Sequence, residues 1–386
     1  MSGHNQATRE VLRSMKCSVS PSALSAALSL VSRAVSPRST LPVLGNVLLE
    51  TTSGGLRVTA TNLDLAIAAT VPAEVELDGR TTVPARLISE YVASLAEAPC
   101  TMELEPSTQV LHLSCGVHRT NLHGIDAVEF PPLPARDADA AIELDAPVFA
   151  NAVTQTAMAA SADEASPVLT GVLFAVEGDR LTLAATDRHR LAVKTLDVQS
   201  SGQKPFTGSV IVPSRHLSEV ARAVNPSRPT VSISFSDQRN QVFFNLKDVD
   251  ISSRLIEGNY PNYAQVIPGE SSTTVKLPTA SLLREAKTAS VLARDAANPV
   301  RLRVGENTLT LVAQTAEVGD DEAPLSASVN GDDVQIAFNA RYVLDALSVL
   351  DSDEVQLSFN GSLQPGVIRP SGRDDYLCII MPVRVP

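Results

Sequence analysis

The sequence predicts an α+β fold built from three tandem copies of one domain, each with two helices packed on antiparallel sheet. The first observation behind this prediction is an alternating segment that recurs along the 386 residues. It reads LRVTAT, LTLAAT and LTLVAQ, starting at Leu56, Leu181 and Leu309, so that successive copies lie 125 and 128 residues apart. Strict alternation of this kind is typical of a half-buried strand.

Two further markers recur in the same order. One is VPAR, VPSR or the degenerate FNAR, whose arginines are Arg86, Arg215 and Arg341, and an apolar helical pattern follows each. The other is PVL, PVL or PVR, which precedes the alternating segment every time. Three markers in one order indicate three copies of a unit, and a chain of this length is too long for a single core.

The first helix of the first copy is predicted to open near Ser22. Leu24, Ala27, Leu28 and Val31 then form one apolar stripe at helical spacing. Its counterparts are predicted over 148–160 and 282–292. The second helix of each copy is marked by its own apolar positions, which are Leu87, Tyr91 and Leu95, then Leu217, Val220, Ala221 and Val224, then Val343, Ala346, Leu347 and Leu350.

Short alternating segments between the helices predict the strands. Examples are 47–49, 66–70, 101–104 and 111–114, which are separated by Gly, Asp and Asn turns.

The three copies end alike, at Phe130-Pro131, Tyr260-Pro261 and Met381-Pro382. We therefore expect a disordered N-terminal extension over 1–14 and domains over 15–136, 137–266 and 267–386.

Composition limits the cellular setting. The four cysteines, Cys17, Cys100, Cys115 and Cys378, show no paired spacing, so reduced and buried thiols are expected. The first residues are polar, and nowhere do eighteen apolar residues run together. We expect a soluble, cytoplasmic protein that does not bind a membrane.

Catalytic motifs are missing from the sequence. His112, His118 and His123 have spacings that fit neither a helical pair nor a zinc set. His189 lies near Asp187, but no serine or cysteine nucleophile motif accompanies it, and no glycine-rich phosphate loop occurs. We expect no catalytic residue, no metal and no cofactor, which disfavours the alternative of a hydrolase built on repeated domains.

Five motifs carry a family resemblance. They are TLPVLGN from Thr40, TVPAR from Thr82, ATDRHRLA from Ala185, LIEGNYPNY from Leu255 and MPVR from Met381. In this order they resemble the bacterial β sliding clamps, the processivity subunits of the replicative polymerase. The resemblance runs from about Met15 to Arg384 and implies three DNA-clamp domains that form a six-domain ring as a head-to-tail dimer. It also implies partners: double-stranded DNA, the polymerase alpha subunit, the clamp loader and other proteins with a clamp-binding motif.

Simple packing permits a dimeric ring but does not require one. Three domains of roughly 35 Å diameter leave a hole of only about 5 Å, too small for a duplex, whereas six leave roughly 35 Å. Two-fold homodimers are also the commonest oligomers. A monomeric peptide-binding scaffold and a second, inhibitor-tolerant clamp copy are the alternatives to this reading.

DNA binding has to be reconciled with a net charge of −12 and a pI near 5.0. An acidic ring admits DNA when its basic residues are segregated, and no base-reading motif is present, so binding directed at phosphates and indifferent to sequence is expected. The alternative is that the basic residues are merely solvated charges at the ends of helices. The resemblance and the predicted positions select Arg33, Arg38, Arg86, Arg215, Arg222, Arg284, Lys287 and Arg341.

The resemblance also implies a cleft between the second and third domains, where partners dock a short hydrophobic peptide. Apolar residues from three sequence regions are expected to meet there, and Met381 can adapt to varied ligands. Arg188 and Gln265 depart from the family pattern, and the alternative for Thr186-Asp187 is a plain turn. The implied cleft residues are Leu169, Gly171, Thr186, Arg188, His189, Arg190, Leu191, Pro261, Val266, Asn339, Tyr342, Ile379, Met381 and Pro382.

For the dimer interface, the resemblance selects Val291 and Leu292, at the end of the first helix of the third copy. The alternative for both residues is burial in the core.

Overall fold

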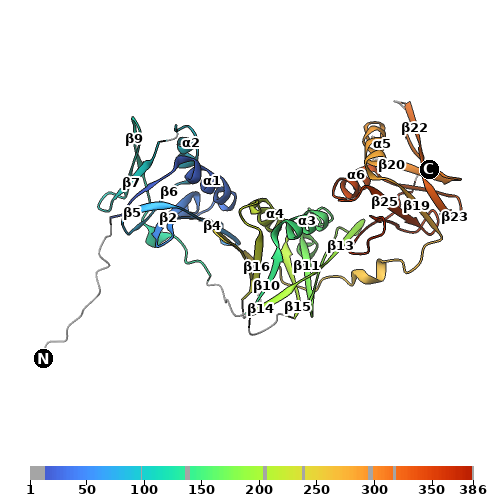
Figure 1. Ribbon diagram of the computed structural model, residues 1–386, viewed down its shortest axis with the longest axis horizontal. Helices are drawn as coiled ribbons and strands as arrows, with labels where there is room; N and C mark the ends of the chain where they lie inside the picture. The colour runs from blue at the N-terminus through green and yellow to red at the C-terminus, as the bar shows by residue number, and fades with distance from the viewer. Residues whose placement is uncertain are drawn as a thin grey trace. The chain divides into compact units, whose positions relative to one another are not determined.

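The computed structural model describes residues 14–96, 98–134, 140–202, 207–236, 240–293, 299–315 and 319–384 (Figure 1). The predicted extension over 1–14 therefore falls almost wholly outside the described residues. Residue contacts divide the chain into two compact units. The first takes 1–137, 225–236 and 241–254, and the second takes 138–224, 237–240 and 255–386.

The described residues of the first unit form two runs of hydrogen-bonded antiparallel strands and two helices. One sheet has the order β5-β1-β7-β8-β9, and the other run has the order β16-β17-β18-β4-β3-β2-β6. The strands of the first sheet are β1 (Lys16–Val19), β5 (Ala73–Leu77), β7 (Cys100–Glu105), β8 (Val110–Cys115) and β9 (His118–His123). Those of the second are β2 (Asn46–Thr52), β3 (Gly55–Thr61), β4 (Leu65–Val71), β6 (Arg80–Pro84), β16 (Thr230–Phe235), β17 (Gln241–Leu246) and β18 (Val249–Arg254).

Two helices of the first unit, α1 (Pro21–Val31) and α2 (Ala85–Ala93), pack against each other. The predicted stripe of α1 is buried, and the helix begins one residue before Ser22 because Pro21 occupies the first turn after an extended Ser20. The predicted stripe of α2 is wrong. Ala85, Ile88 and Val92 face the core, whereas Leu87 is 51% exposed and Leu95 lies beyond the end of the helix.

The second unit holds a sheet with the order β15-β11-β12-β13-β27-β26-β25-β19-β23, a sheet with the order β22-β21-β20-β24, and the paired strands β10 and β14. The strands of the first are β11 (Gly171–Glu177), β12 (Arg180–Thr186), β13 (Arg190–Asp197), β15 (Gly208–Pro213), β19 (Thr273–Pro278), β23 (Ser328–Gly331), β25 (Glu354–Phe359), β26 (Gly366–Pro370) and β27 (Tyr376–Ile380). The others are β10 (Ala140–Asp145), β14 (Gln199–Gly202), β20 (Pro299–Gly305), β21 (Thr308–Thr315), β22 (Gly319–Ser326) and β24 (Val334–Asn339).

Helices pack in pairs in this unit too. They are α3 (Ala146–Ala157) with α4 (Ser214–Ala223) and α5 (Thr279–Leu292) with α6 (Ala340–Ser348). Single 3₁₀ turns occur at η1 (Ser32–Ala34), η2 (Pro42–Gly45), η3 (Ala127–Glu129), η4 (Pro167–Thr170) and η5 (Tyr263–Val266).

The sequence markers fall on corresponding elements. The alternating segment forms β3, β12 and β21, and each marker arginine lies in the first turn of α2, α4 or α6. PVL forms η2 and η4, whereas PVR opens strand β20 instead of a 3₁₀ turn. The three-copy architecture predicted from the repeats is confirmed.

A polar network joins β13 to β27, the last strand of the chain. The Lys194 side chain is only 4% exposed, and its Nζ lies 2.5 Å from an Asp375 carboxylate oxygen. Arg373 donates to Asp375 at 2.8 Å and to Asp351 at 2.9 Å. Hydrogen bonds from Arg373 and then Lys194 lower the pKa of Asp375 to about 2. The network fastens two strands that lie more than 180 residues apart in sequence.

All four cysteines are free and buried, as predicted. Among the described helices, none combines the length and apolar character needed to cross a membrane.

Candidate apolar binding cleft

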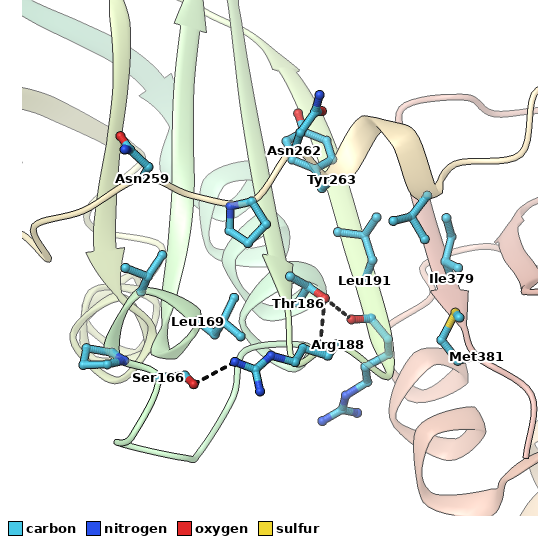
Figure 2. A pocket seen from close by; sticks show the side chains of 15 residues that line it. Ser166, Leu169, Thr186, Arg188, Leu191, Asn259, Asn262, Tyr263, Ile379 and Met381 are labelled. Atoms are coloured by element: carbon cyan, nitrogen blue, oxygen red, sulfur yellow. Dashed lines mark hydrogen bonds between the residues drawn. The ribbon is translucent and has the colours of Figure 1, made fainter.

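A cleft of about 490 Å³ opens in the second unit, at the edge where β13 meets β27 (Figure 2). Four stretches of chain line it: the η4 turn, the β12–β13 turn, the segment 259–266 and the end of β27. Its lining residues are Ser166, Pro167, Val168, Leu169, Thr186, Arg188, Arg190, Leu191, Asn259, Pro261, Asn262, Tyr263, Val266, Ile379 and Met381.

The floor of the cleft is part of the hydrophobic core. Leu191 and Ile379 are direct cross-strand neighbours, and both are buried in one cluster with Leu173 and Ile211. Met381 follows on the same edge and keeps 38% of its surface exposed. The cleft therefore offers a rigid apolar floor and a flexible thioether at its rim, which suits an apolar ligand.

The segment over the cleft is held by a half-buried tyrosine. The Tyr260 hydroxyl accepts a hydrogen bond from the Thr186 backbone N–H at 3.0 Å. Burial raises the pKa of Tyr260 to about 12, so the hydroxyl stays neutral. Gly258, with φ of 133°, lies where a Cβ would come within 2.8 Å of Val168. These contacts place Pro261 and its neighbours against the end of β12.

The β12–β13 turn is a compact hydrogen-bonded loop. Asp187 Oδ1 accepts from the backbone N–H groups of His189 at 3.0 Å and Arg190 at 2.9 Å. Thr186 Oγ1 accepts from the Arg188 N–H at 3.2 Å and donates to the Arg190 carbonyl at 2.6 Å. The turn interpretation of Thr186-Asp187 is confirmed, although Thr186 lines the cleft as well.

The two arginines of the cleft have different partners. Arg190, with a side chain 10% exposed, lies 3.0 Å from Asp187 and 2.6 Å from Asp345, and its guanidinium stands 4.5 Å from the centre of the Tyr342 ring. The exposed Arg188 donates to the Ser166 hydroxyl at 3.0 Å, as Figure 2 shows. Arg190 is thus neutralised within the fold, whereas Arg188 faces solvent at the cleft wall.

Nine of the predicted cleft residues line this cavity. They are Leu169, Thr186, Arg188, Arg190, Leu191, Pro261, Val266, Ile379 and Met381.

Five predicted residues do not line it. Gly171 is packed instead, because a Cβ there would lie 2.4 Å from Ile211. Asn339 caps α6 by accepting from the Arg341 N–H at 2.9 Å. Tyr342 supports Arg190 and stacks on His189, with ring centroids 6.4 Å apart, and Pro382 follows the rim residue Met381.

Six lining residues were not predicted: Ser166, Pro167, Val168, Asn259, Asn262 and Tyr263. The sequence already pointed to them, because Pro167 and Val168 belong to the PVL marker, Ser166 precedes it, and Asn259, Asn262 and Tyr263 flank the Tyr-Pro sequence that closes the repeat.

The predicted DNA-binding residues are all exposed. Arg33 belongs to η1 and Arg38 to the loop after it, Arg86 to α2, Arg215 and Arg222 to α4, Arg284 and Lys287 to α5, and Arg341 to α6. Several have an acidic neighbour: Arg86 with Glu90 at 2.7 Å, Arg215 with Glu164 at 3.7 Å, Arg222 with Glu219 at 2.5 Å and Arg284 with Glu285 at 2.8 Å. Exposed pairs of this kind are weak and exchange readily with other anions.

Val291 and Leu292 end α5. Val291 is 57% exposed and Leu292 is half-buried, so core burial does not account for Val291. In the described part of the chain, no three His, Cys, Asp or Glu side chains gather as a metal site would require.

Comparison with known proteins gives the same result for each of the three repeats. Family models described as the N-terminal, central and C-terminal domains of the DNA polymerase III beta subunit match residues 15–134, 143–262 and 264–384. A beta sliding clamp from Synechocystis sp. is 36% identical, covering 96% of this chain and 100% of that protein. One from Staphylococcus aureus is 30% identical, covering 91% and 94%.

Solved structures agree. The DNA polymerase sliding clamp from Bacillus subtilis superposes with a TM-score of 0.90 at 30% identity, covering 96% of this chain and 100% of that one. A sliding clamp from Pseudomonas aeruginosa bound to griselimycin gives 0.88 at 27% identity, with the same coverage.

Proposed function

The chain belongs to the DNA polymerase III beta subunit family, the bacterial sliding clamps, and from that premise we propose how its own residues carry out the work of a clamp. It is a non-catalytic processivity factor of DNA replication. The proposal has three parts: a cleft for partner peptides, a basic helical surface for DNA, and a ring made by two copies.

The cleft beside Leu191, Ile379 and Met381 binds short apolar peptide segments of the clamp's partners. These partners are the replicative polymerase alpha subunit, the clamp loader and other proteins with a clamp-binding motif. The observation that supports this part is an open, apolar cleft on a rigid sheet edge. Removing apolar surface from water stabilises a complex by roughly 25 cal/mol per Å². Met381 and Val266 are exposed in the free protein, so they favour binding of an apolar ligand.

A fluorescence polarisation titration tests the cleft. The probe is a labelled nonapeptide with a central Leu-Leu-Phe, and the variant is Met381→Ala, which trims the rim without opening the core. Leu363→Ala is the matched control, because Leu363 is exposed but lies in the β25–β26 turn away from the lining residues. Weaker binding by Met381→Ala alone supports peptide binding in the cleft, and equal binding by both variants refutes it.

DNA passes through a ring that two copies close head to tail, with six domains in all. The exposed basic residues on α2, α4, α5 and α6 contact phosphates without reading bases. Charge reversal of Arg38 and Arg86 should weaken retention on a circular duplex, with steeper loss at high salt. Normal retention of the variant at low and high salt would show that Arg38 and Arg86 do not contact the DNA.

The last turn of α5, with Val291 exposed, supplies apolar contacts between copies. Sedimentation over a dilution series tests this part. A species of twice 40.8 kDa that Val291→Asp converts to monomer supports it, and a wild-type monomer would leave a peptide-binding scaffold without a ring. We also propose domain boundaries near 136 and 266 and action in the cytoplasm.

A further inference from the structure

Arg188 places an available positive charge on the wall of an apolar cleft. Its side chain crosses beneath Leu169 toward the η4 turn and donates to Ser166 (Figure 2). A serine hydroxyl is a neutral acceptor, so this bond leaves the guanidinium charge unbalanced. Among the described residues, no carboxylate lies within ion-pair distance of Arg188.

The remaining lining strengthens the effect of this charge. The other lining arginine, Arg190, is already held between Asp187 and Asp345. None of the described residues that line the cleft is acidic. In a chain with a net charge of −12, the cleft is therefore a local site where an anionic side chain is attracted.

The fold itself does not require an arginine at this position. Arg188 has φ of 75°, a left-handed backbone that costs a side chain roughly 1 kcal/mol and suits glycine. The corresponding turn of the first repeat has the same geometry at Leu63, with φ of 79°. The turn thus forms with an uncharged residue, and the arginine has to be explained by what it contacts.

We propose that Arg188 is a specificity-determining residue, which selects peptide ligands that carry an aspartate or glutamate beside their apolar anchor. The proposal rests on the proposed function, since it requires the cleft to bind peptides. When the ligand's carboxylate arrives, the guanidinium exchanges its bond to Ser166 for a charge-assisted pair, which arginine makes with two parallel hydrogen bonds. The apolar anchor fills the floor at Leu191 and Ile379, so the acid acts as a selector and not as the main source of affinity.

The test uses a panel of labelled nonapeptides with a central Leu-Leu-Phe, flanked on either side in turn by Asp, Asn or Lys. Wild-type protein should bind the best Asp peptide about threefold to tenfold more tightly than its Asn counterpart. That preference should shrink as salt is raised from about 50 to 300 mM, since screening weakens an exposed pair.

Three variants isolate the cause. Arg188→Gly, which suits the left-handed turn, should bind the Asp and Asn peptides with equal affinity. Arg188→Glu should prefer the Lys peptide. Arg180→Ala is the matched control, because it removes one positive charge from the exposed start of β12, at the opposite end of the strand from Thr186, and should keep the wild-type preference.

The results distinguish failure of the proposed role of Arg188 from failure of peptide binding by the cleft. If peptides bind in a Met381-dependent way but show no Asp preference, or keep it in Arg188→Gly, the cleft function stands and the role of Arg188 is overturned. If no peptide binds, both fail together.

Discussion

Two hollows in this molecule occupy corresponding places on the repeated fold, one in each unit. The first lies where β4 pairs with β18, and the second where β13 pairs with β27. The turns beside them contain equivalent hydrogen bonds. Thr61 Oγ1 donates to the Leu65 carbonyl at 2.9 Å, as Thr186 does to that of Arg190 at 2.6 Å.

The side chains on the two edges differ. At the first hollow, Ala66 lies opposite Ser252, whereas at the second Leu191 lies opposite Ile379. The first hollow measures about 180 Å³ and carries Asp250, whose carboxylate accepts from Arg57 at 2.8 Å. The second measures about 490 Å³. The repeat therefore provides a hollow at both places, and the cross-strand pair is small and partly polar at the first but large and apolar at the second.

Exchanging Leu191 and Ala66 between the two hollows is expected to have the largest effect on the free energy of unfolding. Leu191→Ala copies the first hollow and should lower the free energy of unfolding by about 2–4 kcal/mol, because it removes a buried leucine from the floor. Ala66→Leu, the reverse exchange in the first unit, should change it by less than about 1 kcal/mol, since an open hollow receives the added carbons. Urea unfolding of both variants checks this, and equal losses would contradict the comparison.

The polar network is a second difference between the edges. Lys194 pairs across the ladder with Tyr376, whereas the corresponding position in the first unit is Ala69, opposite Val249. Asp375→Ala should cost about 2–3 kcal/mol, because it leaves a buried ammonium without its carboxylate. Lys194→Met should cost less, since Asp375 keeps Arg373 as a partner. Chemical denaturation ranks the two, and the opposite order would refute the assigned cause.

Acid should weaken this same network. The pKa of Asp375 is lowered to about 2 from an ordinary value of 3.8, so its ion pairs stabilise the fold above about pH 4. That contribution is lost as pH falls from about 4 toward 2. The stability difference between wild type and Asp375→Asn should therefore shrink over this window, and a constant difference would contradict the lowered pKa.

The smallest expected effect concerns the turn itself. Arg188→Gly should leave the free energy of unfolding within about 0.5 kcal/mol of wild type, because relief of the left-handed backbone offsets the greater flexibility of unfolded glycine. Leu63→Gly should behave alike, as its φ is nearly the same. A loss above about 1 kcal/mol in either variant would show that the side chain supports the fold.

The repeated markers made the three-copy architecture predictable, and the family motifs predicted most of the cleft lining. Helix phase at α2 was less predictable, because Leu87, Ile88 and Tyr91 allow two apolar stripes and only packing selects one. The support role of Tyr342 could not be read from sequence either. It depends on an arginine more than 150 residues earlier, brought near by the pairing of β13 with β27.

Hydrogen–deuterium exchange with and without a saturating Leu-Leu-Phe nonapeptide tests the difference between the two hollows most directly, because it observes both in one sample. We expect slower exchange over 186–191, 259–266 and 376–381, with no change over 61–66 and 249–254. Equal protection at both edges, or protection at the first alone, would contradict the claim that the Leu191–Ile379 pair distinguishes the two hollows.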